Sequence, residues 1–228
     1  APLLEHITEL RQRLLRAAIA LVIGAFIGSI FTRPAVELLV RPTQTADIVV
    51  LSPTEGPITY FRVSLFLGVI FALPFITYQI YAFIRPGLYP RERRFMRLSI
   101  PLVLLLFLLG TAFGLFVLVP LSLPVLSGFF SGIVDPMYSL NEYLGFVTAI
   151  LLWMGLLFQT PLVIYVLAVF GFVEPRGLKK VRKYVIFGAG FLAAVITPTT
   201  DPVTMLLAMA PFVVLYEVGI LLAGLAAR

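Results

Sequence analysis

Two short segments of the sequence place a glutamate among arginines: LLEHITELRQRLL at residues 3–15 and YPRERRFMRL at residues 89–98. Glu9 precedes Arg13 by four residues, the spacing and order that favour an ion pair on one helix face. Glu92 follows Pro90, which suits a first helical position, so the helix dipole favours its negative charge. A carboxylate flanked by arginines is ionised and can accept two hydrogen bonds from one guanidinium. The chemistry these residues could perform is recognition of arginine.

Each glutamate also has a purely structural interpretation. Glu9 can serve as half of an intrahelical pair on a solvated face, and Glu92 as an ordinary acidic residue of a first turn. Catalytic chemistry has less support in the sequence. The chain has no Cys and one His, which excludes thiolate metal sites, disulfides and cysteine nucleophiles. We find no His-Glu zinc motif and no Ser-Lys, Ser-His or paired Asp arrangement within the apolar stretches. The sequence predicts no catalytic residue, metal site or cofactor.

The composition indicates what class of protein carries these glutamates. Of 228 residues, 61% are apolar and only 12% are charged, and the mean hydropathy is +1.06. A soluble domain carries about twice that share of charge. This composition excludes a soluble enzyme and a disordered tail. It also argues against a nucleic-acid partner, because the basic residues behind the net charge of +6 adjoin apolar spans. It predicts an all-α polytopic membrane protein.

Charges and prolines divide the chain into six expected spans, about 14–32, 63–84, 98–119, 143–173, 184–197 and 203–226, within a single domain covering 1–228. We expect Pro120 and Pro124 to end the third helix. The fifth span has fourteen residues, or about 21 Å of helix, so we expect its outer turn to lie below the membrane surface. Two further helices are predicted outside the spans. Residues 3–14 form an amphipathic helix on the inner surface, and the capping sequence 52–55 starts a short outer helix.

The distribution of positive charge predicts the orientation of the chain. Fourteen of the 17 Lys and Arg residues fall on the side that holds both termini, and three fall on the other. The positive-inside rule therefore puts both termini in the cytoplasm. The first apolar run lacks a small-residue cleavage pattern, so it is predicted to be a span and no signal peptide. The cationic segment 176–183 is expected to lie against anionic lipid.

Taken in order, several motifs are similar to the TatC family, the receptor subunits of twin-arginine protein translocases. The strings are EHITELRQRL, SPTE, YQIYAFIRPGLYPRERR, FQTPLVIYVL, EPRGLKKVRKYV, TPTTDPV and LLAMAPFVVLYEVG. The resemblance implies six helices with a concave face and short fifth and sixth helices. It also implies a multi-pass protein of a bacterial or archaeal cytoplasmic membrane. Such proteins bind twin-arginine signal peptides of folded precursors and recruit TatA-like and TatB-like single-span subunits. Transport uses the proton-motive force, and self-association is expected.

The resemblance also implies roles for individual residues. Signal-peptide binding falls on six positions, which are Glu9, Glu92, Arg11, Arg13, Gln79 and Phe83. Pro42 matches a proline of the first outer loop, which the family uses for contacts with neighbouring subunits. Two positions depart from the family pattern and are assigned to partner docking. Gln159 replaces a common Glu near mid-membrane, and the turn before Asp201 is one residue longer. Gln159 could instead satisfy a local helix defect at Pro161 or bond a neighbouring helix of the same chain.

Two other functions remain as alternatives. A secondary transporter or channel for a small solute would place ionisable residues near mid-membrane, often with inverted repeats. Glu217 is the only charged residue well inside an apolar span, and we find no internal repeat. An intramembrane hydrolase has the least support, because the catalytic pairs named above are missing from the spans.

Overall fold

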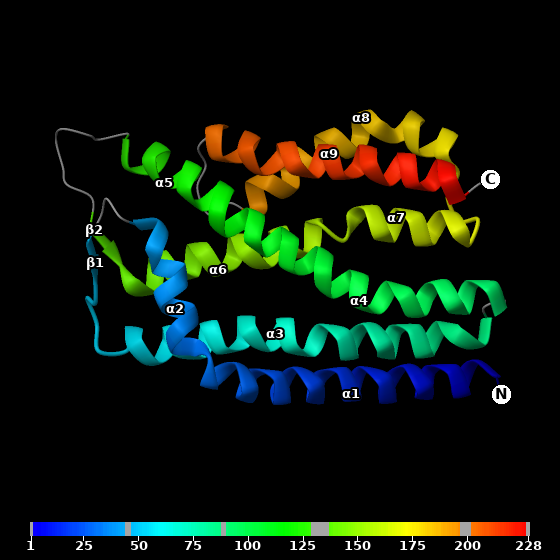
Figure 1. Cartoon of the computed structure of the whole chain (residues 1–228), viewed down its shortest axis with the longest axis horizontal. Coiled ribbons are helices and arrows are strands. Elements are labelled where there is room, and N and C mark those ends of the chain that lie inside the picture. The colour runs from blue at the N-terminus through cyan, green and yellow to red at the C-terminus, as the bar shows by residue number, and fades with distance from the viewer. Residues whose placement is uncertain (1, 44–46, 88–89, 129–136, 197–201, 227–228) are drawn as a thin grey trace. The chain divides into compact units, whose positions relative to one another are not determined.

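The structure is a computed structural model of the chain. It describes all residues except 1, 44–46, 88–89, 129–136, 197–201 and 227–228. The described residues form helices and two short strands (Figure 1). The α-helices are α1 (Pro2–Ile30), α2 (Thr32–Val40), α3 (Glu55–Ile84), α4 (Pro90–Phe113), α5 (Val119–Gly128), α6 (Leu140–Leu157), α7 (Thr160–Val169), α8 (Pro175–Ile196) and α9 (Pro202–Ala226). Shorter elements are the 3₁₀ turns η1 (Arg41–Thr43) and η2 (Arg85–Gly87), the π-helical segment η3 (Gly114–Leu118), and the strands β1 (Asp47–Val49) and β2 (Met137–Ser139).

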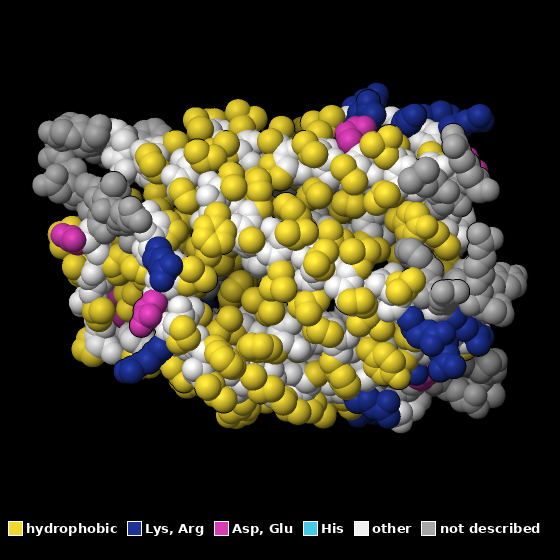
Figure 2. Space-filling view, in the orientation of Figure 1, with side chains coloured by type: hydrophobic (Ala, Val, Ile, Leu, Met, Phe, Trp, Pro, Cys, Tyr) yellow, Lys and Arg dark blue, Asp and Glu magenta, His cyan; other side chains and the backbone are white. Residues whose placement is uncertain are grey.

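Five helical stretches within the described residues are long and apolar enough to cross a membrane. They are His6–Ile30, Glu55–Ile84, Met96–Gly128, Leu140–Val169 and Met205–Gly224. Hydrophobic side chains cover the middle of the face seen in Figure 2, and Lys and Arg side chains gather near helix ends. The fifth expected span is the apolar half of α8, whose first half carries the cationic segment. With 22 and 25 residues, α8 and α9 are both shorter than the 30-residue α3.

The chain divides into two compact units, of which the first comprises residues 1–37 and 60–105. Here α1 and α3 run antiparallel and touch through glycines (Figure 1). A Cβ on Gly24 would lie 2.6 Å from the carbonyl oxygen of Gly68, and a Cβ on Gly28 would lie 2.7 Å from that of Ser64. The hydroxyls of Thr32 and Ser64 hydrogen-bond at 2.8 Å. Small residues and buried hydroxyls are the usual means by which membrane helices associate, because lipid supplies no hydrophobic drive between them.

The second unit comprises residues 38–59 and 106–228 and has α6 at its core. Buried residues of α6 include Leu144, Val147, Ile150 and Met154. The α4–α6 contact is again close, since a Cβ on Gly110 would lie 2.4 Å from the carbonyl oxygen of Met154. Helices α7 and α8 pack against α9. Strands β1 and β2 pair in parallel, so the segment that follows η1 is joined to the segment before α6.

The prediction that Pro120 and Pro124 end the third helix is wrong. The helix continues through η3 into α5 and ends at Gly128. A proline removes one backbone donor and its ring presses on the carbonyl four residues earlier. In η3 the bonding widens, and the Val119 amide donates to the Gly114 carbonyl five residues before it. This wider turn immediately before Pro120 lets the chain accept the ring without leaving the helix.

The two helices predicted outside the spans do not exist as separate elements. Residues 3–14 are the first part of α1, which runs unbroken to Ile30; no proline or glycine interrupts it between Pro2 and Gly24. The turn at Ser52 leads directly into α3, whose first residue Glu55 donates its amide to the Ser52 carbonyl at 3.1 Å. The Glu55 carboxylate is buried and accepts from the amide of Asn141 at 3.5 Å, in the first turn of α6. The capping residues therefore begin a span and cap a second one.

Candidate functional site

The first half of the candidate site is the Glu9–Arg13 pair on α1. Oε1 of Glu9 accepts from Nε of Arg13 at 2.9 Å, and Nη2 of Arg13 donates to the same oxygen. The predicted pairing at four-residue spacing is thus confirmed. The side chain of Glu9 is 35% exposed and that of Arg13 is 19% exposed. Both hydrogen bonds use Oε1, so Oε2 of Glu9 is turned away from Arg13.

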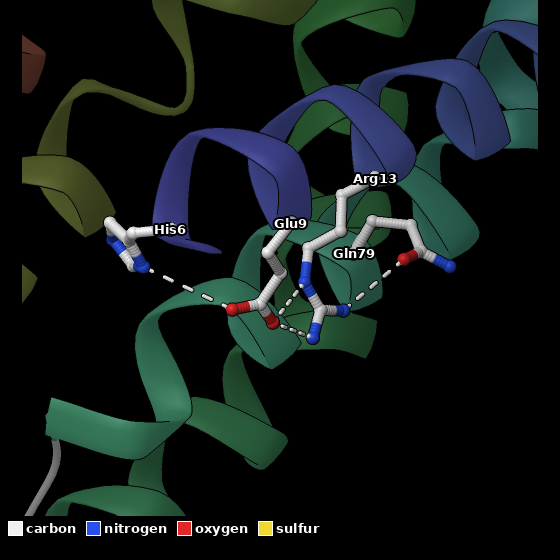
Figure 3. A network of polar contacts seen from close by, with 4 residues as sticks. All are labelled: His6, Glu9, Arg13 and Gln79. Atoms are coloured by element: carbon white, nitrogen blue, oxygen red, sulfur yellow. Dashed lines mark hydrogen bonds and ion pairs between the residues drawn. The ribbon is translucent and has the colours of Figure 1, made fainter. Parts of the chain in front are cut away.

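Gln79 of α3 holds Arg13 from the other side (Figure 3). Its side-chain oxygen accepts from Nη1 of Arg13 at 3.4 Å, and Gln79 is only 6% exposed. Because Gln79 is buried in the α1–α3 contact, it anchors a guanidinium that in turn orients Glu9. The structure thereby joins three of the six residues that the sequence assigned to signal-peptide binding.

His6 completes the network, and sequence analysis gave it no role beyond dismissing a metal site. Its Nδ1 lies 3.9 Å from Oε2 of Glu9. Its ring stacks on Phe83 of α3, with centroids 4.4 Å apart and planes inclined by 23°. His6 therefore links Phe83, a predicted site residue, to Glu9. The signal was available, because His6 and Glu9 are three residues apart and share a helix face.

Two predicted site residues remain, Arg11 and Glu92. Arg11 is exposed and lies two residues from both Glu9 and Arg13, on another face of α1. Glu92 lies in the first turn of α4, as predicted, and its side chain is outside the described part of the structure. Five residues separate the end of α3 from the start of α4, so the backbone of Glu92 is at the same end of α3 as Phe83.

Gln159 lies at the break between α6 and α7. The amide of Gln159 donates to Leu156 at 3.0 Å, three residues back, so it does not continue the α-helical bond to Gly155. The side-chain Nε2 of Gln159 donates to the Gly155 carbonyl instead, at 3.4 Å. Pro161 follows at the start of α7. Gln159 thus makes a local bond within its own helix, but the carbonyl it reaches is that of Gly155 and not that of Leu157, which Pro161 leaves without its α-helical donor.

The remaining predicted docking residues are only partly described. Pro42 lies half-buried in η1, which packs against α5. Asp201 lies outside the described residues. The acidic residue that sequence analysis noted inside the last span, Glu217, is paired: Nη2 of Arg182 on α8 donates to its Oε2 at 2.6 Å. Next to it, the hydroxyl of Tyr216 donates to the Leu178 carbonyl of α8 at 2.9 Å. Among the described residues, no group of His, Asp and Glu is arranged to hold a metal ion.

Comparisons with known proteins agree with this arrangement. Residues 5–211 match the family model described as Sec-independent protein translocase protein (TatC). The TatC protein of Aquifex aeolicus is 39% identical, over 100% of this chain and 96% of its own length. That of Carboxydothermus hydrogenoformans is 34% identical, over 97% and 92%.

Two solved structures are similar along nearly the whole chain. A crystal structure of the twin-arginine translocase receptor TatC superposes with a TM-score of 0.85 at 35% identity and covers 98% of this chain and 100% of its own. A second, in the detergent DDM, gives 0.87 at 36% identity and covers 96% and 99%. The predicted all-helical membrane fold is confirmed by these matches. The chain belongs to the TatC family, and it is the non-enzymatic, multi-pass receptor subunit of a twin-arginine translocase.

Proposed function

We propose that the arginine pair of a twin-arginine signal peptide binds at the end of the first unit where α1 begins, α3 ends and α4 begins. The observation that carries this proposal is the partly exposed Glu9 carboxylate, held by Arg13 with one oxygen turned away (Figure 3). Glu9 accepts one arginine of the peptide and Glu92 accepts the other. Arg13 and Gln79 orient Glu9, Phe83 borders the site with His6 stacked on it, and Arg11 contributes from the exposed face.

The geometry indicates how a second guanidinium could enter. Arg13 uses only Oε1 of Glu9, so an incoming guanidinium can bind through Oε2, the oxygen that faces His6. A carboxylate has lone pairs for both contacts. Hydrogen bonds to charged groups contribute about 1.5–3 kcal/mol each. One such bond to each of the two carboxylates supplies about 3–6 kcal/mol, which corresponds to a Kd between the millimolar range and the tens of micromolar.

The test compares charge-reversed variants with a matched control. We expect Glu9→Lys and Glu92→Lys each to abolish binding of a labelled peptide that carries S-R-R-x-F-L, measured in detergent at low salt. Glu5→Lys makes the same charge change on α1 and should have much less effect. A peptide with Lys-Lys in place of Arg-Arg should bind weakly, since an ammonium cannot form the bidentate contact. Unchanged affinity in both single variants would refute the assignment.

The location, orientation and partners follow from the same proposal. We infer that both termini lie in the cytoplasm and that the chain resides in the cytoplasmic membrane of a bacterium or archaeon. The supporting observation is the bias of Lys and Arg to one side of the spans. The receptor delivers folded precursors to an assembly with TatA-like and TatB-like single-span subunits, driven by the proton-motive force, and associates with further copies of itself.

For docking of these subunits we propose Gln159, Pro42 and Asp201. Gln159 is half-buried and near the middle of its span, where an amide can exchange its bond to Gly155 for one to a partner's helix. Hydrogen bonds between membrane helices are worth only about 0.6–2 kcal/mol, which suits partners that must dissociate. Pro42 would contribute on the outer side, beside α5.

A solute transporter or channel is the second candidate, and the pairing of Glu217 weakens it. Transport pathways use intramembrane charges that can bind and release ions, whereas Glu217 is held by Arg182. Reconstituted protein should show no flux of small solutes in proteoliposomes. Flux that disappears in Glu217→Gln would favour the transporter instead.

A further inference from the structure

A groove of about 330 Å³ runs along the first unit between α1 and α3. Its walls are large apolar side chains that are about half exposed. They are Ile19, Ile23 and Ile27 of α1 and Phe71 and Phe75 of α3. In a membrane protein, exposed apolar walls of this kind face hydrocarbon.

The floor of the groove exists because small residues line the contact between the two helices. Ala20 and Gly24 of α1 and Ala72 of α3 form it. A Cβ on Gly24 would lie 2.6 Å from the Gly68 carbonyl oxygen and 3.4 Å from Cβ of Ala72, so the helices already touch. The larger Ile and Phe side chains on either side extend beyond these small residues, so the space between the walls stays open.

One end of this apolar groove is closed by a positive charge. Arg16 lines the groove and is exposed, and no ion pair or hydrogen bond joins it to any other residue that the structure describes. It shares a face of α1 with Ile19, Ile23 and Ile27, at helical spacing. A long arginine side chain at this depth extends toward the membrane–water interface.

The length of the groove indicates what kind of molecule can occupy it. From Arg16 to Ile27 there are eleven residues, or about 16 Å of helix. One leaflet contributes about half of the 30 Å hydrocarbon core, so the groove spans one leaflet, with its cation at the level of the headgroups. A partner's transmembrane helix would extend through both leaflets, whereas this groove lines only one of them.

We propose that this groove is a binding site for one anionic phospholipid, with an acyl chain between the Ile and Phe walls and the phosphate on Arg16. The site is separate from signal-peptide recognition. It starts one turn beyond Arg13 and uses none of the side chains of the Glu9 network. An anionic headgroup complements Arg16, whereas a zwitterionic one carries its own cation close to the phosphate.

The test is equilibrium binding of fluorescent phosphatidylglycerol to the purified full chain in detergent, with competition by unlabelled phosphatidylglycerol, phosphatidylcholine or inorganic phosphate. We expect phosphatidylglycerol to compete best and inorganic phosphate not to compete, since the acyl chain supplies much of the affinity. Arg16→Gln should lower affinity for phosphatidylglycerol about fivefold, the contribution of one Arg near an anionic surface. Arg33→Gln removes the same charge from an exposed site outside the groove and should leave affinity unchanged.

A second pair of variants tests the apolar part. Ala20→Leu fills the floor and should reduce binding of both lipids, whereas Ala18→Leu adds the same atoms to an exposed position outside the groove and should not. Equal affinities for the two lipids, no effect of Arg16→Gln, or equal effects of Ala20→Leu and Ala18→Leu would each overturn the proposal. So would efficient cross-linking of a cysteine at position 23 to a single-span subunit in the assembled complex. A thermal unfolding midpoint of Ala20→Leu equal to that of Ala18→Leu shows that the fold tolerates the added volume in the groove.

Discussion

The α4–α6 contact gives the sharpest prediction about stability, through Gly110→Ala. A Cβ at position 110 would lie 2.4 Å from the Met154 carbonyl oxygen and 2.8 Å from its carbonyl carbon, whereas ordinary contact begins at 3.4 Å. Both atoms are backbone, so no side chain can move aside and the helices must separate by about 1 Å. A gap of that size removes a quarter to a half of the dispersion energy of each atom pair between the two helices. Added to the usual cost of overpacking, the substitution should lower the free energy of unfolding by about 2–4 kcal/mol.

The control is Gly188→Ala in α8, because nothing lies within 4 Å of a Cβ at that position. Alanine favours a helix over glycine by roughly 0.5–1 kcal/mol, so this variant should be as stable as the parent or slightly more so. Thermal unfolding in one detergent measures both, and a loss of this size lowers the midpoint by several degrees. If Gly110→Ala melts within a degree of Gly188→Ala, the inferred rigidity of the α4–α6 contact is wrong.

Three further predictions concern other parts of the molecule. Tyr143→Phe removes a buried 2.7 Å hydrogen bond to a backbone carbonyl of α2 and should cost about 1–3 kcal/mol in the same unfolding assay; a neutral result would show that water replaces the phenol. Gln159→Leu should weaken assembly with single-span subunits in pull-downs while signal-peptide binding persists, and Gln159→Glu should be tolerated; normal assembly of the Leu variant would rule out docking. Because the chain has no Cys, single cysteines at 91 and 180 should react with an impermeant reagent from the cytoplasmic side, and one at 139 from outside; the reverse pattern would invert the proposed orientation.

The sequence was sufficient wherever a local rule decides the structure. Helical spacing predicted the Glu9–Arg13 pair, and the apolar stretches between charges predicted the helical membrane fold. Pro161 indicated a local helix defect, and α7 begins at Thr160, immediately before it, although one helix over 143–173 was expected. Each of these follows from the order of residues along a single segment, for which helix geometry suffices.

The errors arose where backbone geometry or a distant contact decides. Pro120 breaks an ordinary α-helix, and only the π-helical η3 before it explains why this helix continues. Glu55 fits a capping box in sequence, yet its carboxylate caps α6, 86 residues away. His6 was given no role in the site, and its contact with Phe83 exists only through the packing of α3 on α1. Sequence spacing carries no information about such contacts.

The π-helical segment also has a consequence for how this chain can change over evolutionary time. A π-helical turn closes its hydrogen bond over five residues instead of four, so Gly114–Leu118 holds one residue more than an α-helical turn would. Deleting one residue here lets the turn close as an ordinary α-helix and keeps the buried residues Val119, Ser122 and Leu123 on the face that packs within the second unit. The same deletion in an α-helical turn would rotate everything that follows by about 100° and take buried side chains off their face. Descendants should therefore gain or lose a residue within Gly114–Leu118 more readily than in the α-helical turns on either side.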